Sequence, residues 1–154
     1  MKLKQTLMFP LMAGALSLTA MGAHAAVTPE QLNSVLDKAN EYGFTHYKEI
    51  SADDGEVEIE GWVGNEWAAE VDFSEDGNVL REERKRRGGN ASGLSADDVR
   101  AAIDAAKAEG VARIDEIETR RGGFIDVEGL DESGRDIEVR LNGDTFKVVN
   151  VDRD

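Results

Sequence analysis

The stretch Val57-Glu58-Ile59-Glu60-Gly61-Trp62 decides the fold of this chain, because apolar and charged residues alternate along it. This period of two is typical of a β-strand with one buried face. The same pattern returns as Ile125-Asp126-Val127-Glu128-Gly129-Leu130. The predicted elements around the two copies also follow the same order, so the sequence indicates one small unit used twice.

Each copy begins with a predicted helix that carries an N-terminal cap. The caps are Thr28, followed by Pro29 and Gln31 in a capping box, and Ser95 in the second copy. Apolar residues then follow at helical spacing: Leu32, Val35, Leu36 and Ala39 in one copy, and Val99, Ala102, Ile103 and Ala106 in the other. About four short alternating segments follow each helix. The sequence therefore predicts an α+β fold of two repeated units, each one helix packed on a four-stranded antiparallel β-meander.

The predicted organisation has four parts. Residues 1–25 have a basic start, an apolar run over Leu7–Ala20 and an Ala23-His24-Ala25 cleavage site, which is typical of a bacterial secretory signal peptide. Residues 26–82 form the first repeat, 83–93 a basic linker with a Gly-Gly pair, and 94–154 the second repeat. We therefore expect a periplasmic or secreted protein, cleaved after Ala25, with no stable membrane insertion afterwards.

The chain is strongly acidic, with 18 Lys and Arg against 32 Asp and Glu. Cleavage would remove Lys2 and Lys4 and leave a net charge of −16. Such a charge argues against nucleic acid and anionic membrane surfaces as partners. It is compatible with cationic partners or divalent cations, and an acidic surface also keeps an exported protein soluble.

The sequence contains no arrangement of residues that predicts catalysis. It has no cysteine, and His46 is the single histidine after the cleavage site, so thiol chemistry, an imidazole metal site and a serine triad are all unsupported. Acidic turns such as Asp53-Asp54-Gly55 do not follow the EF-hand spacing. We therefore expect no catalytic residues, no cofactor and no metal site.

Two groups of residues are candidates for contact with a partner. The alternation places Trp62 on the acidic, water-facing side of its strand, with Leu130 as its counterpart in the second copy. The alternative is that Trp62 packs over its own hairpin. The basic run Arg81–Arg87 contributes three further candidates, Arg84, Arg86 and Arg87, although it would equally suit a strand end and flexible linker paired with acidic faces. Parity also predicts that Ile59 lies beside Ala69 and that Trp67 belongs to the core.

The second copy resembles the PepSY domain. The resemblance rests on Gly123-Phe-Ile-Asp-Val-Glu-Gly-Leu130 and Gly134-Arg-Asp-Ile-Glu-Val-Arg-Leu141, after a capped helix that ends in glycine. It is best over Leu94–Asp152 and weaker over Val27–Glu82, and the turn Asn142–Thr145 departs from the family pattern. The resemblance implies a fold similar to the tandem beta-lactamase inhibitory protein. Such domains occur in protease propeptides, where they inhibit or chaperone the enzyme, and in small exported proteins, and they share no catalytic residues.

The leading hypothesis is therefore a non-enzymatic, periplasmic protein-binding module, of the peptidase-inhibitor or regulatory kind. The alternative hypothesis is an acidic envelope accessory protein that binds a divalent cation or a cationic peptide. The sequence leaves the oligomeric state open.

Overall fold

The computed structural model of this chain describes residues 26–154, so the predicted signal peptide and its cleavage lie outside the described residues. Ten elements follow one another: α1 (Pro29–Tyr42), β1 (Phe44–Asp53), β2 (Glu56–Val63), β3 (Trp67–Ser74), β4 (Val79–Arg86), α2 (Ala96–Ala108), β5 (Arg113–Arg120), β6 (Phe124–Leu130), β7 (Asp136–Asn142) and β8 (Val148–Arg153). No helix among these residues is long and apolar enough to cross a membrane.

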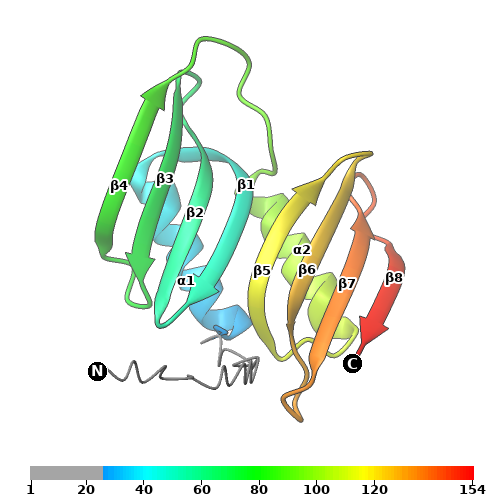
Figure 1. Cartoon of the computed structure of the whole chain (residues 1–154). Coiled ribbons are helices and arrows are strands. Elements are labelled where there is room, and N and C mark those ends of the chain that lie inside the picture. Colours follow the sequence, from blue (N-terminus) through cyan, green and yellow to red (C-terminus); the bar gives the residue numbers. More distant parts are fainter. Residues whose placement is uncertain (1–25) are drawn as a thin grey trace, which may run out of the picture.

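The strands form a single eight-stranded sheet in the order β4-β3-β2-β1-β5-β6-β7-β8, and every neighbouring pair is antiparallel. Both helices lie on the same side of this sheet, behind it in Figure 1, and the strands β4 and β8 form its two edges. The centre of the sheet is the antiparallel pair β1 and β5, each of which follows a helix in the chain.

The prediction of two repeated units, each one helix on a four-stranded meander, is wrong. The eight strands make one continuous sheet, and the buried residues of both halves belong to one hydrophobic core. Helix α2 packs against β1 as well as against β6, which joins the halves further. The physical reason is size, because a unit of about 60 residues buries too little surface to be comfortably stable alone. Pairing β1 with β5 buries an edge of each half and merges their cores.

The predicted helix caps are confirmed. The Thr28 hydroxyl accepts a hydrogen bond from the Gln31 N–H, and the Gln31 side chain accepts one from the Thr28 N–H. Ser95 and Asp98 repeat this reciprocal arrangement at α2. The two reciprocal bonds satisfy donors that the first turn of a helix leaves without partners. The apolar stripes predicted for both helices are buried.

The predicted pairing of β2 with β3 is wrong by two residues. Ile59 lies opposite Val71, and Gly61 rather than Ile59 lies opposite Ala69. A three-residue turn follows Val63, and β2 and β3 pair without a bulge. As a consequence Trp67 starts β3 at the very end of the sheet, opposite Val63, and is 40% exposed instead of buried in the core.

The predicted linker 83–93 is also partly wrong, because β4 continues to Arg86. Its residues pair with β3 along their whole length, from Val79 opposite Phe73 to Arg86 opposite Trp67. Charged side chains do not prevent this, since every β4 residue is exposed and an edge strand tolerates charge on both faces. The connector between the halves is therefore shorter than expected.

Candidate functional site: the open face of the sheet

The face of the sheet that turns away from both helices, called here the open face, carries most of the polar residues of the strands. The residues that alternate with them, such as Ile59, Ile117 and Val127, are buried in the core on the helix side. Successive side chains of a strand point to opposite faces, so their neighbours Glu58, Glu116 and Glu128 belong to the open face. This face turns toward the viewer in Figure 1.

A line of carboxylates crosses the open face from strand to strand, and we call it the central acidic row. The paired positions, in sheet order, are Asp72, Glu58, Ser51, Glu116, Glu128, Glu138 and Asp152, and Arg81 of β4 lies opposite Asp72 at the edge of the sheet. Adjacent strands lie about 4.8 Å apart, and directly opposed like charges destabilise a sheet. The central acidic row, interrupted only at Ser51, therefore concentrates negative charge along the middle of this face.

A second row runs parallel to the first and contains cations as well as acids. Its paired positions are Glu83, Glu70, Glu60, Glu49, Glu118, Asp126 and Arg140. Lys48, at a bulge of β1, places its ammonium 2.8 Å from a Glu60 oxygen, and Arg120 lies 2.9 Å from Glu118. Cations contact the central row too, since Arg81 lies 2.8 Å from Asp72 and 3.9 Å from Glu58. Arg120 lies 3.8 Å from Glu128 and Arg140 lies 3.5 Å from Glu138, although both arginines also contact Asp126 of the second row.

Asp126 is the most deeply buried carboxylate of the sheet, with 2% of its surface exposed. Arg140 donates to both of its oxygens at 2.7 Å, and the Arg120 Nε donates at 3.0 Å. The hydrogen bonds from Arg140, followed by those from Arg120, lower the pKa of Asp126. Bidentate Arg–carboxylate pairs combine charge with fixed geometry. Asp126 therefore holds two guanidinium groups in place, and neither group is free to neutralise the whole central row.

The crowding of acids changes the pKa values of the central row. Burial, then repulsion from Glu128, a hydrogen bond to Glu118 and repulsion from Glu49, raises the pKa of Glu116 to about 7. Burial followed by the charge of Glu138 raises the pKa of Glu128. Burial followed by the charge of Glu70 raises the pKa of Glu58. Desolvation and like charges both disfavour the ionised form. At Glu58 and Glu128 these effects outweigh the nearby charges of Arg81 and Arg120, which lower the pKa values.

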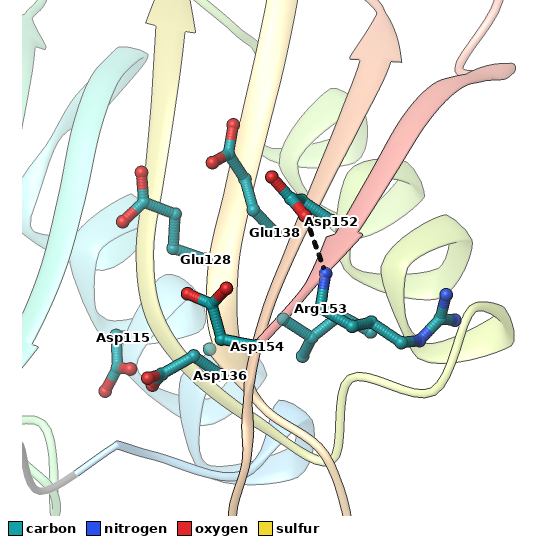
Figure 2. Close-up of a pocket in the computed structure, with 9 residues that line it drawn as sticks. Asp115, Glu128, Asp136, Glu138, Asp152, Arg153 and Asp154 are labelled. Carbon is teal, nitrogen blue, oxygen red and sulfur yellow. Dashed lines mark hydrogen bonds between the residues drawn. The ribbon is translucent and has the colours of Figure 1, made fainter.

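Two shallow hollows on the open face are lined mainly by acids. The first, of about 230 Å³, lies over β6, β7 and β8, and its polar lining consists of Asp115, Glu128, Asp136, Glu138, Asp152, Arg153 and Asp154. Figure 2 shows that the Glu128 and Glu138 carboxylates point the same way on neighbouring strands, while the Arg153 guanidinium extends away from them. The second hollow, of about 400 Å³, is lined by Ser51, Asp53, Asp54, Glu56, Glu58, Asp72 and Arg81. Both hollows suit positive charge.

The structure places Trp62 and Leu130 on the open face, as their parity requires. Trp62 lies opposite His46 and Ala68, whereas Leu130 lies opposite Arg113 and Asp136. Both side chains are half-buried. They belong to β2 and β6, which are separated by β1 and β5, so they are not neighbours. Of the two, Trp62 adjoins the second row at Glu60.

Two of the three arginine candidates, Arg84 and Arg86, do not lie on the open face with Trp62 and Leu130. Arg84 lies opposite the buried Ala69 and therefore on the helix side, where its guanidinium stacks 4.6 Å above the Tyr42 ring and its Nε donates to the Tyr42 hydroxyl. Arg86 shares that side and pairs with Glu66 at 3.3 Å. Arg87 lies just beyond β4, where its N–H donates to the Glu66 carbonyl. Arg87 also lines a hollow with Glu60 and Ala68, which adjoin Trp62. Arg87 and Trp62 are therefore close, but the five predicted residues form no common surface.

Sequence reasoning missed the central acidic row, and in particular Glu116. Each strand shows its own alternating acids in the sequence, which was the available signal. Their alignment depends on the pairing of β1 with β5, which places Glu49 opposite Glu118 and Ser51 opposite Glu116. No local pattern in the chain specifies that pairing.

Among residues 26–154, no group of three or more His, Asp or Glu side chains is arranged to hold a metal ion. Comparison with known proteins gave no match to any family model, curated protein or solved structure.

Proposed function

We propose that this chain is a non-enzymatic, exported binding protein that takes a positively charged segment of another protein on the open face of its sheet. The observation that carries this proposal is the central acidic row, whose six carboxylates share three arginines, Arg81, Arg120 and Arg140. A partner that brought lysine or arginine side chains to the row would relieve the repulsion between these carboxylates. Charge complementarity of this kind speeds association and selects partners.

We propose no reaction, because the side chains of the described residues offer no catalytic arrangement. The ring Nδ1 of His46, the single histidine of residues 26–154, lies 3.0 Å from the hydroxyl of its neighbour Thr45. The Thr45 hydroxyl donates to the backbone carbonyls of Trp62 and Gly64, so its proton is directed away from the ring and the pair is not arranged as a nucleophile with its base. The resemblance to the PepSY domain also supports a binding role, since such domains in protease propeptides inhibit or chaperone the enzyme. Export to the periplasm or medium follows from the signal-like residues 1–25 and belongs to the same proposal.

The proposal is tested by calorimetric titration of the purified protein with a synthetic Lys- and Arg-rich peptide and with its Gln-substituted counterpart. We expect binding of the basic peptide only. The affinity should fall by about tenfold when the salt is raised from about 0.05 to about 0.3 M, because salt screens exposed charges.

Two matched triple variants locate the contact. Glu58→Gln, Glu128→Gln and Glu138→Gln together remove three charges from the central acidic row. Glu75→Gln, Asp76→Asn and Glu132→Gln remove three charges from exposed turns instead. We expect the first variant to lose the peptide and the second to keep it. Equal losses in both would mean attraction by net charge alone and would overturn the proposal, as would no binding by the unaltered protein.

Trp62→Ala tests whether the aromatic ring belongs to the contact surface. Trp62 lies beside Glu60 on the open face and is half-buried, so a bound segment that covers the second row would meet its ring. Aromatic anchors of this kind dominate many interfaces, and we expect the substitution to weaken peptide binding by about tenfold. Trp67→Ala, at the exposed end of β3, is the control and should bind normally. If Trp62→Ala binds the peptide with unchanged affinity, the ring is not part of the contact surface and only the carboxylates remain in it.

A further inference from the structure

The joint between the two halves of the sheet is short. Only three residue pairs join β1 to β5, namely Glu49–Glu118, Ile50–Ile117 and Ser51–Glu116. On either side of these pairs other segments occupy the strand edges, because Leu94 bridges to Tyr47 and Val27 bridges to Ile114. By contrast, β1 pairs with β2 from Phe44 to Asp53. The joint therefore depends on few backbone hydrogen bonds.

The two faces of the joint are unlike each other. On the helix side, Ile50 and Ile117 are both 2% exposed and belong to the core. On the open face, Glu49 lies directly opposite Glu118, and Glu116 lies diagonally across from Glu49. Directly opposed like charges oppose the pairing of two strands. The core thus holds the joint together while the carboxylates push it apart.

The charged groups around Glu116 come from every strand packed against it. Its own strand contributes Glu118 and Arg120, β6 contributes Glu128 and Asp126, and β1 contributes Glu49. The nearby cations are largely engaged. The Arg120 guanidinium contacts Glu118 and Asp126 and stands 3.8 Å from Glu128, and Lys48 contacts Glu60. Glu116 therefore stands among three other glutamates, and the nearby Arg120 is shared between it and the carboxylates that Arg120 contacts directly.

We propose that the β1–β5 joint is a pH-sensitive hinge, which closes when Glu116 and Glu49 are protonated and loosens when both are ionised beside Glu118. The proposal needs no partner and stands apart from the proposed function.

The sign of the effect follows from the direction of the shifts. The pKa of Glu116 is raised to about 7 and the pKa of Glu49 is raised as well, in both cases by burial first and then by neighbouring acids. A carboxyl whose pKa is higher in the folded chain than in the unfolded chain binds protons more tightly when folded. The joint is therefore strongest below the ordinary glutamate pKa of 4.5 and weakens as the pH rises toward 7 and beyond.

Hydrogen–deuterium exchange of the joint tests this inference in the purified protein. The backbone amides of residues 49–51 and 116–118 should lose protection by about tenfold between pH 6 and pH 8, after correction for the intrinsic exchange rate, since one pKa unit of linkage corresponds to that factor. Amides within the β3–β4 pair, which β2 separates from β1, should change much less.

Glu116→Gln is the decisive variant, because it removes the charge and keeps the shape. It should protect the joint at pH 8 and abolish most of its pH dependence. Glu83→Gln is the matched control, since Glu83 also faces a glutamate, Glu70, but at the β3–β4 pair. Glu49→Gln provides a second variant at the joint itself. The hinge is ruled out if the joint of the unaltered protein exchanges alike at both pH values, or if Glu116→Gln keeps the full pH dependence.

Discussion

Gly61→Ala should destabilise the folded chain by about 3 kcal/mol, because the added methyl group would collide with backbone that has no room to move. A Cβ at Gly61 would stand 2.1 Å from the carbonyl oxygen of His46 and 3.2 Å from the Cα of Tyr47. These atoms belong to β1, whose pairing with β2 shifts register just before His46 and again just after Tyr47. The contact is with main chain in the middle of the sheet and not with the end of a flexible side chain.

The second half of the sheet repeats this close approach. A Cβ at Gly129 would lie 2.0 Å from the carbonyl oxygen of Arg113, next to the register shift in the β5–β6 pair. Gly129→Ala should therefore cost a similar amount. Because the same close approach occurs in both halves, we infer that the glycine in each alternating stretch leaves room for the backbone of the bulged strand beside it.

Urea denaturation at neutral pH measures both variants. Gly88→Ala is the control, because a Cβ at Gly88 would meet nothing within 4 Å. We expect the control to change the free energy of unfolding by less than about 0.5 kcal/mol, as most surface substitutions do. A loss below about 1 kcal/mol in Gly61→Ala would show that β1 yields easily at its bulge and would contradict the rigid backbone contact described above.

Asp126→Asn should destabilise the chain by about 2 kcal/mol, which is the usual worth of hydrogen bonds made to a charged group. The carboxylate is 2% exposed and accepts from Arg140 and Arg120. An amide keeps the shape but loses the charge, and one of its ends becomes a donor that faces guanidinium donors. Both arginines are more than two-fifths exposed and can turn toward water, which limits the loss.

The pH dependence of this variant has a definite sign. Hydrogen bonds from Arg140 lower the pKa of Asp126 below its ordinary value of 3.8. A lowered pKa means that the stabilisation is present above the pKa of the unfolded chain and is lost as the pH falls through the folded value. The difference between the unaltered protein and Asp126→Asn should therefore be full at pH 7 and should shrink below about pH 4.

The measurement is the free energy of unfolding at a series of pH values, with Asp76→Asn as the control. Asp76 lies in the exposed turn after β3 and should respond little to the same substitution. A constant difference between Asp126→Asn and the unaltered protein across the whole pH range would refute the ionic account, since a purely steric effect would not titrate. The effect at Asp126 and the hinge at Glu116 act in different pH ranges, so a single series separates them.

Local features of this fold could be predicted from the sequence. The caps Thr28 and Ser95, the apolar stripes of the helices and the alternation of β2 and β6 depend on residues within a few positions of one another. The parity of Trp62 was predicted correctly for the same reason. The length of β4 was not, because charged residues such as Arg84 suit both an exposed edge strand and a connector.

The candidate site could be predicted only in part. The sequence shows an excess of acids and marks Trp62, but it separates Glu49, Glu116 and Glu128 by long intervals. Their alignment follows from strand register, and the register of β2 with β3 was predicted wrongly by two residues because both registers place apolar residues on the core side.

By itself, the sequence determined which segments are helix and strand and which side chains of each strand face the core, since these properties depend on the period of local residues. The tertiary structure alone decided that the halves share one sheet, which carboxylates become neighbours, and that Trp67 is exposed. These depend on the pairing of β1 with β5 and on strand ends meeting across the sheet. Such contacts join residues far apart in the chain, and the burial of a common core selects them.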